Sequence, residues 1–263
     1  MATIIEQKTC AMRIQYASDL HLELPANEQL LMERPLVPSG DILVLAGDIA
    51  YLDDSYTEHP FWDWASGHYR QVIVALGNHE FYNHYDLTTM KDGMKGKIRH
   101  NVYWYYNNVV HIDDVDFIVS TMWSHIKDEN MHFTEYSVTD FHRIRYNGHI
   151  LTSEDFNKEH ERCMTFLKHA VDQSTAKTKI VITHHVPSYR VTTEWFASHS
   201  YIGAFTADLD DYIKDSGIDV WIYGHSHWNI ETKIGKTLLT SNQLGYVHRK
   251  EHHRFDRRKF IEV

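Results

Sequence analysis

Short apolar runs that alternate with helical patterns predict an α/β organisation. Five runs are rich in β-branched and aliphatic residues and end in polar residues, which is typical of buried strands. These runs are 12–18, 41–48, 71–78, 179–185 and 219–225. Two other stretches, 109–123 around Asp113–Asp114 and 228–242 around Gly235, indicate hairpins. The sheet structure is therefore expected to be mixed rather than purely parallel.

Helical spacing is clearest over residues 153–173. The apolar residues that share one face of this stretch are Phe156, Cys163, Phe166, Leu167 and Ala170. Thr152, with Asp155 three residues later, matches a capping box and predicts where this helix starts. A second helix is expected over about 207–216, where Gly217 supplies a stop signal.

Composition adds limits on the class of protein. The chain has 263 residues, of which 43% are hydrophobic and 13% aromatic, enough for a large core. Two cysteines exclude a disulfide scaffold, and no apolar run approaches the ~18 residues of a membrane span. We expect a reduced, cytoplasmic protein with no membrane partner. Residues 1–11 are interpreted as an N-terminal extension and 12–263 as one domain.

The charge balance bears on possible partners. The formal net charge is -10, which argues against a protein that holds long nucleic acid through a broad basic surface. A small anionic substrate remains compatible with this charge, because bound cations can dominate the local field.

Polar residues follow all five predicted strands at the same end. The segments there read SDLHLE, AGDIAY, LGNHEFY, ITHHVP and YGHSHW. This edge is where open α/β sheets bind ligands. Asp19 and His21 are two residues apart, as are His225 and His227, so in extended backbone each pair would point to one side and could reach one metal.

The third segment differs, because Asn78 and His79 are adjacent and would point apart in extended backbone. If Asn78 binds a metal, His79 is free for another task. Glycines precede three of the groups, at Gly47, Gly77 and Gly224, and permit tight turns and close backbone approach there.

In this order, the motifs resemble the calcineurin-like metallophosphoesterase superfamily. The matching residues are Asp19-x-His21, Gly47-Asp48, Gly77-Asn78-His79-Glu80, His184 and Gly224-His225-x-His227. The resemblance covers about residues 12–242. It implies an α/β fold in which two mixed β-sheets pack as a sandwich flanked by helices.

The resemblance also implies two metal ions and a set of ligands. The first ion would be held by Asp19, His21 and His227, the second by Asn78, His184 and His225, with Asp48 as the bridge. Carboxylate, amide and imidazole donors without thiolate favour Mn, Fe or Zn. The implied activity is hydrolysis of phosphate monoesters or diesters by a hydroxide between the metals.

Three further residues receive implied roles. His79 would act as general acid toward the leaving oxygen, or as a hydrogen-bond donor to the phosphoryl group. Glu80 would support the loop or His79 rather than bind metal. His185 competes with His184 for one ligand position, and His184 is preferred because it follows the strand directly.

The motifs of this chain differ from those of two branches of the superfamily, and the differences limit which branch it can resemble. The segments GDIAYLD and GNHEFYN lack the arginines of protein Ser/Thr phosphatases. Tyr51 resembles the iron-binding tyrosine of purple acid phosphatases, but those enzymes lack the histidine that His21 supplies here. Tyr51 is therefore expected to pack beside the site.

Two polar segments carry further predictions. Residues 120–146 are expected to form a lid or substrate loop in which Arg143 and Arg145 contact phosphate oxygens; the alternative is a solvated loop with Arg–Asp pairs. Residues 248–259, HRKEHHRFDRRK, are interpreted as a solvated charged end.

Two other functions are considered beside the enzyme. One is a metal-bound interaction scaffold without turnover, which is disfavoured because all seven ligand positions and His79 are present. The other is a nuclease for short nucleic acid, in which an aromatic loop at Trp104–Tyr106 would stack bases.

Overall fold

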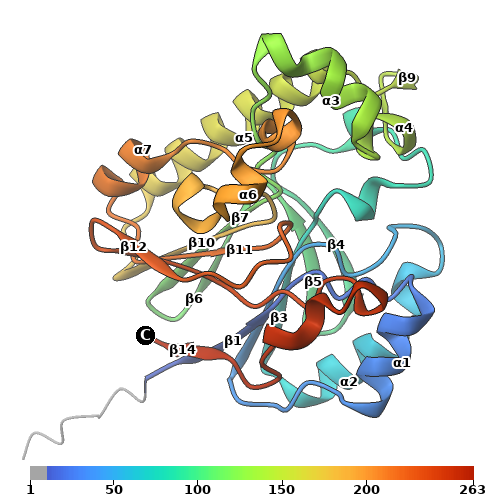
Figure 1. Cartoon of the computed structure of the whole chain (residues 1–263). Coiled ribbons are helices and arrows are strands. Elements are labelled where there is room, and N and C mark those ends of the chain that lie inside the picture. The colour runs from blue at the N-terminus through green and yellow to red at the C-terminus, as the bar shows by residue number, and fades with distance from the viewer. Residues whose placement is uncertain (1–10) are drawn as a thin grey trace, which may run out of the picture.

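The computed structural model describes residues 11–263 and arranges most strands in two six-stranded sheets (Figure 1). The first sheet has the order β14-β1-β2-β3-β5-β4 and the second has the order β12-β13-β11-β10-β7-β6. The strands of the first sheet are β1 (Arg13–Ala17), β2 (Ile42–Ala46), β3 (Gln71–Ala75), β4 (Met94–Arg99), β5 (Val102–Tyr106) and β14 (Phe260–Glu262). Those of the second are β6 (Asn108–Ile112), β7 (Val115–Ser120), β10 (Thr178–Thr183), β11 (Val220–Tyr223), β12 (Thr232–Ile234) and β13 (Thr237–Ser241). A small hairpin joins β8 (Arg145–Tyr146) and β9 (His149–Ile150).

Seven α-helices and several short 3₁₀ helices connect these strands in the described part of the chain. The α-helices are α1 (Pro25–Glu33), α2 (Phe61–His68), α3 (Met131–Ser137), α4 (Asp140–Arg143), α5 (Ser153–Gln173), α6 (Glu194–Ala197) and α7 (Asp210–Asp215). The 3₁₀ helices are η1 (Tyr56–Glu58), η2 (His79–Phe81), η3 (Leu87–Thr89), η4 (Asp128–Asn130), η5 (Tyr189–Val191), η6 (Ser200–Ala204), η7 (Val247–Arg249) and η8 (Glu251–Arg254). None of the helices within residues 11–263 combines the length and apolarity that crossing a bilayer requires.

Each sheet has a parallel centre and antiparallel edges, so the expectation of mixed sheets is confirmed. In the first sheet β1, β2, β3 and β5 are parallel, whereas β14 pairs antiparallel with β1 and β4 pairs antiparallel with β5. In the second, β7, β10, β11 and β13 are parallel and β6 and β12 are antiparallel. The parallel strands therefore deliver their C-terminal ends to shared edges, which is the arrangement that collects the polar motifs.

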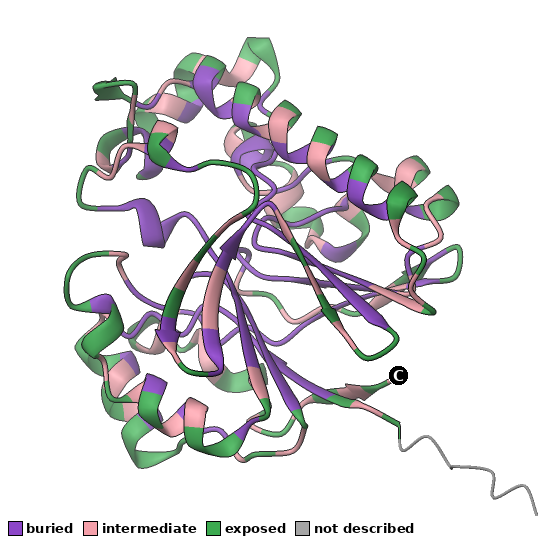
Figure 2. Cartoon of the chain, turned by 180° about the vertical axis from the view of Figure 1, so that it is seen from behind, coloured by how far each residue is buried: buried purple, intermediate pink, exposed green. Residues whose placement is uncertain are grey.

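The two sheets pack face to face and bury both faces of their central strands. Along β2, Ile42 and Val44 belong to the core between the sheets, while Leu43 and Leu45 belong to the core beneath the helices. This alternation explains why the strand is apolar throughout rather than at every second residue. Figure 2 shows the consequence, with buried strands inside and helices whose outer faces are exposed.

Helices cover the outer face of each sheet. Trp62 of α2 packs in one cluster with Leu43 of the first sheet, together with Leu31 of α1. Leu167 of α5 packs in another cluster with Trp221 of the second sheet, together with residues of α7. The resulting order of layers is helix, sheet, sheet, helix (Figure 1), as the resemblance implied.

Most predicted elements are confirmed. Helix α5 spans Ser153–Gln173, and Thr152 and Asp155 form the capping box at its start. Both hairpins are present, as β6–β7 and as β12–β13, where Gly235 turns with a φ of 58°. Helix α7 is shorter than the predicted 207–216. Of the predicted N-terminal extension, residues 1–10 lie outside the described part of the chain.

Two predictions were wrong. Trp104–Tyr106 is not a loop but part of β5, where Tyr105 and Tyr106 are buried and Trp104 packs over Gly96, so these rings are not available to stack bases. The segment 120–146 is not a loop, because it folds into η4, α3, α4 and part of β8 and packs in a core with residues such as Phe81 and Phe156; its expected role as a lid or substrate segment stays a prediction. The residues of this segment that enter the core are Trp123, Ile126, Met131, Val138, Phe141, Ile144 and Tyr146.

Candidate metal centre

The polar motifs at the strand ends adopt left-handed backbone, which the sequence did not predict. Asp19, His21, Asp48, His225 and His227 all have positive φ, between 47° and 73°. Such backbone costs about 1–3 kcal/mol for a residue other than glycine, and it concentrates at functional sites. The expectation of extended backbone was therefore wrong, although the side chains still converge.

The first group consists of Asp19, His21 and His227. Ligand-capable atoms of the three lie within 4.8 Å of one another. The Nε2 atoms of His21 and His227 are 3.2 Å apart, and His227 Nε2 is 3.4 Å from Asp19 Oδ1. The outer nitrogens are also held, because His21 Nδ1 is 3.0 Å from Glu23 Oε1 and His227 Nδ1 is 2.6 Å from Glu251 Oε2. Both imidazoles are thus fixed with Nε2 facing inward.

The second group joins Asp48, Asn78, His184 and His225. His184 Nε2 lies 3.0 Å from Asn78 Oδ1 and 3.3 Å from Asp48 Oδ1. His225 belongs to the same cluster as Asp48 and His184. His225 Nε2 is 3.3 Å from the Ala204 carbonyl oxygen, which leaves Nδ1 as the other ring nitrogen for a ligand.

Asp48 lies between the two groups. Its Oδ1 faces His184, whereas its Oδ2 is 3.8 Å from His21 Nε2. Burial raises the pKa of Asp48, but His184 and His79 outweigh burial and hold that pKa well below its ordinary value. Asp48 is therefore a carboxylate whose two oxygens face two different sets of donors.

His184 and His185 have different surroundings. His185 Nδ1 is 3.0 Å from Ser124 Oγ, and its ring stacks on His225 at 4.2 Å. Its Nε2 is buried and has no hydrogen-bond partner within residues 11–263. His184 is the member of this pair that reaches Asn78 and Asp48, while His185 packs behind His225.

The donor atoms fit the separations that metal ions impose. Two donors bonded to one ion at ~2.1 Å are ~3.0 to ~3.4 Å apart at octahedral or tetrahedral angles. The closest separations in the first group are 3.2 and 3.4 Å, and those in the second are 3.0 and 3.3 Å. Imidazole nitrogens and carboxylate oxygens without thiolates suit Mn, Fe or Zn. The described residues thus form two adjoining sites that could each hold an ion.

Glycines make this close packing possible. A Cβ on Gly77 would lie 2.7 Å from the Asp48 backbone nitrogen, and one on Gly224 would lie 2.8 Å from Asp19 Oδ2. Gly47, with a φ of 87°, lies against the His184 ring. All three glycines therefore bring backbone to within contact of candidate ligands.

Glu80 lies behind the second group. Its carboxylate accepts hydrogen bonds from the backbone nitrogens of Asp48 at 2.9 Å, Ile49 at 2.7 Å and Gly77 at 2.6 Å. Burial and the nearby Asp48 raise the pKa of Glu80 to about 7. Glu80 thus connects the loop after β2 to the loop after β3.

His79 is buried, and both of its ring nitrogens have partners. Its Nδ1 is 2.9 Å from Glu23 Oε1, and its Nε2 is 3.2 Å from the Tyr246 hydroxyl. Burial lowers the pKa of His79, but Asp48 and Glu23 more than compensate, and the net pKa is raised. His79 also clusters with His21 and Asp48 within 4.8 Å, so it lies close enough to act on a ligand of either site.

Four residues at this site had no assigned role from the sequence. Glu23 accepts from both His21 and His79, and Asp140 Oδ1 accepts a 2.8 Å hydrogen bond from Asn78 Nδ2. Tyr246 and Glu251 contact His79 and His227 respectively. Only Glu23 carried a signal, because it continues the two-residue spacing of Asp19 and His21. The C-terminal segment 248–259 is therefore not simply a solvated charged end.

The remaining predicted residues separate in space. The Arg143 guanidinium carbon lies 6.0 Å from the ring centre of Tyr51 and 5.4 Å from that of Tyr82. The Tyr51 ring in turn lies 6.3 Å from His79, so Tyr51 is beside the site. Arg145 is exposed and donates to the Gly148 carbonyl oxygen within its own hairpin. Only Arg143 of the two arginines lies on aromatic rings next to His79.

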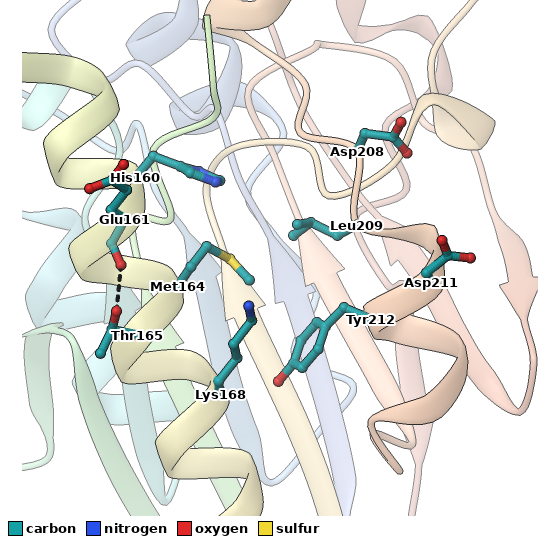
Figure 3. Close-up of a pocket in the computed structure, with 9 residues that line it drawn as sticks. All are labelled: His160, Glu161, Met164, Thr165, Lys168, Asp208, Leu209, Asp211 and Tyr212. Atoms are coloured by element: carbon teal, nitrogen blue, oxygen red, sulfur yellow. Dashed lines mark hydrogen bonds between the residues drawn. The ribbon is translucent and has the colours of Figure 1, made fainter. Parts of the chain in front are cut away.

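A separate groove lies between α5 and the segment that leads into α7 (Figure 3). It has a volume of about 660 Å³ and mixes Glu161 and Lys168 of α5 with Asp208, Asp211 and Tyr212. None of the candidate ligands lines it. The metal-binding chemistry of the described residues is thus concentrated at the strand ends and not in this groove.

The fold and the site define a class of α/β sandwich proteins that present two adjoining sets of metal ligands at their strand ends. The model of the calcineurin-like phosphoesterase family matches residues 12–229, and the chain belongs to this family. The resemblance inferred from the motifs is confirmed.

Two similar proteins cover nearly the whole chain. Uncharacterized protein L509 of Acanthamoeba polyphaga mimivirus is 29% identical over 275 residues, which cover 95% of this chain and 96% of that protein. The phosphopantetheinyl hydrolase PptH of Mycobacterium tuberculosis has a similar structure, with a TM-score of 0.69, 16% identity and 95% of each chain covered. This structural likeness concerns the fold.

Proposed function

We propose that this protein hydrolyses small phosphate esters with two metal ions. The ions would be held by Asp19, His21 and His227 and by Asn78, His184 and His225, with Asp48 shared between them. The observation that carries this proposal is the position of Asp48, whose Oδ1 and Oδ2 face different histidines. Mn, Fe and Zn are the ions that this donor set favours.

Two ions bound here would polarise the phosphoryl oxygens and activate a water molecule for attack on phosphorus. Every ligand is itself oriented by a neighbour, as Glu23 orients His21 and Asp140 orients Asn78. Mutation of such a hydrogen-bond partner typically lowers metal affinity by about 10–100-fold. The chain therefore supplies rigid ligands, and no serine or cysteine nucleophile is needed.

His79 is the residue we assign as general acid. Glu23 accepts from His79 Nδ1, and His79 Nε2, which lies 3.2 Å from the Tyr246 hydroxyl, is the ring nitrogen left to act on a substrate. A proton held on Nε2 could pass to the departing ester oxygen, a role that contributes about 10²–10⁴-fold to rate. We assign Arg143 to the substrate, because it lies over rings that contact His79, and we assign no such role to Arg145.

A small ester is a better substrate for this chain than long nucleic acid, since the formal net charge is -10. The similar Mycobacterium tuberculosis protein is named as a phosphopantetheinyl hydrolase. A phosphopantetheine diester therefore belongs among the substrates to be assayed, although a likeness of fold does not assign it.

Hydrolysis of nitrophenyl phosphate and bis(nitrophenyl) phosphate by the Mn²⁺-loaded protein tests the proposal. We expect turnover of at least one ester, lost on chelation and in Asp48→Asn but retained in Asp208→Asn, which changes an exposed carboxylate outside the site. Absence of turnover while two ions are bound would support the scaffold alternative. Faster cleavage of short oligonucleotides than of both esters would support the nuclease alternative.

A further inference from the structure

Two tyrosines contact His79, and an arginine lies over each of them. The Tyr82 ring stacks on His79 at 4.2 Å, and the Arg143 guanidinium carbon is 5.4 Å from the centre of that ring. At the Nε2 edge of the ring, the Tyr246 hydroxyl is 3.2 Å from His79 Nε2, and the Arg249 guanidinium carbon is 5.2 Å from the Tyr246 ring centre. Each of the two positive charges thus lies one aromatic ring away from the residue that we assign as general acid.

These two arginines come from distant parts of the chain. Arg143 ends α4, and Arg249 ends η7 near the C-terminus. The C-terminal segment is tied to the metal centre, because the Gly245 nitrogen donates to the Asp19 carbonyl oxygen and Glu251 holds His227. Its position beside the site is therefore fixed by hydrogen bonds.

The C-terminal segment is also cationic in an acidic protein. Residues 248–259 contain six lysines and arginines against two acidic residues, whereas the whole chain has a formal net charge of -10. Arg249 lies over the Tyr246 ring, which in turn lies against His21, so the guanidinium is within about one Debye length of His21, ~10 Å at 0.1 M salt, and its charge is only partly screened there.

Both guanidinium groups are available for a ligand. Within residues 11–263, neither Arg143 nor Arg249 forms a salt bridge, and the one hydrogen bond of the Arg143 guanidinium is a long 3.4 Å contact to Asn83. Five other arginines are engaged by carboxylates: Arg13, Arg70, Arg99, Arg162 and Arg190. A guanidinium without a carboxylate partner retains the donor fork that recognises phosphate or carboxylate.

We propose that the leaving group of the substrate carries a second anionic group, which binds between Arg143 and Arg249. This inference rests on the proposed role of His79, because a general acid must face the departing oxygen and so marks the leaving-group side. The oxygen of water bonds to phosphorus, and the ester P–O bond breaks. His79 gives its proton to the departing oxygen and regains one from the attacking water.

The substrate class is thus a phosphate ester whose leaving alcohol bears a phosphate or a carboxylate. Simple esters of neutral alcohols would still reach the metal ions, but they would leave both guanidinium groups without a partner.

Calorimetry on the Mn²⁺-loaded protein tests this without turnover. The probes are adenosine 3′,5′-bisphosphate and adenosine 3′-monophosphate, which differ only by the second anion. We expect the bisphosphate to bind about tenfold or more tightly, the effect of one or two charge-assisted hydrogen bonds. The preference should fall at least several-fold in Arg143→Gln and in Arg249→Gln, and Arg249→Lys should restore part of it.

Arg258→Gln is the matched control, because Arg258 is an exposed arginine of the same segment. The proposal would be overturned if the unchanged protein bound the bisphosphate and the monophosphate with equal affinity. It would also be overturned if both glutamine variants kept the full preference for the bisphosphate. An equal loss in Arg258→Gln would overturn it as well, since it would indicate only general charge. If the preference holds while neither nitrophenyl ester is hydrolysed, the proposed enzymatic function fails and the anion site remains.

Discussion

Gly77 has no space for a side chain, and this gives a direct test of the metal centre. In Gly77→Ala, the new Cβ would lie 2.7 Å from the Asp48 backbone nitrogen and 2.8 Å from His184 Cδ2, and it would meet the Asp48 carboxylate. The Asp48 backbone cannot yield easily, because its nitrogen is held at 2.9 Å by Glu80 Oε2. The substitution therefore pushes apart two strand-end loops at the shared carboxylate.

The size of the effect follows from these distances. An ordinary Cβ contact begins at 3.4 Å, so the 2.7 Å contact must open by about 0.7 Å. Metal–ligand distances tolerate only about ±0.2 Å. Disturbing the residues around a ligand costs about 10–100-fold in metal affinity. Overpacking adds about 1–3 kcal/mol of lost stability.

Two measurements check this prediction. Calorimetric titration with Mn²⁺ should show a dissociation constant raised at least about tenfold, and elemental analysis should show fewer ions per chain. Urea unfolding of the metal-free protein should show a lower free energy of unfolding. The matched control is Gly67→Ala in α2, where a Cβ has no atom within 4 Å and alanine favours the helix by up to ~1 kcal/mol.

The reasoning would be refuted if Gly77→Ala bound two ions with unchanged affinity. It would also be refuted if the unfolding free energy fell while metal binding did not change, because the strain would then be absorbed outside the site. Equal effects of Gly67→Ala on metal binding would show that the assay reports glycine replacement in general.

Three further substitutions test separate parts of the structure. His79→Ala should lower the hydrolytic rate by ~10²-fold or more with metal content unchanged; loss of metal would instead identify His79 as a ligand. Asp48→Asn should weaken binding of both ions, and elemental analysis that finds one ion lost and the other retained would contradict its shared role. Thr152→Ala should lower the free energy of unfolding by ~1 kcal/mol through the lost cap of α5, whereas Thr165→Ala on the exposed face should change it little.

Local pattern was enough to predict much of the fold. The central strands could be predicted because both of their faces are buried, which makes the runs continuously apolar. Helix α5 could be predicted because its cap and its apolar face both lie within one contiguous stretch. Strand β5 was misread as a loop because a Tyr/Trp-rich run carries no clear alternation, and α1 and α2 were missed because they are short and weakly patterned.

The candidate ligands were also predictable, since the motifs that contain them are contiguous and occur in a fixed order. Their convergence required the tertiary structure. Asp19 follows β1 and His227 follows β11, and these strands belong to different sheets. The two residues meet because the packing of the sheets brings the C-terminal ends of the two strands together. Left-handed backbone then aims each side chain inward, and nothing local in a D-x-H or H-x-H sequence specifies that conformation.

The sequence by itself determined which residue types stand at the strand ends and therefore which chemistry is available. The tertiary structure alone decided which residues support them. Glu23 lies near His21 in the chain, but Asp140, Tyr246 and Glu251 come from segments far away. Their contacts depend on how the packed sheets position loops that are far apart in the chain. Short-range sequence patterns carry no information about which of these loops will lie side by side.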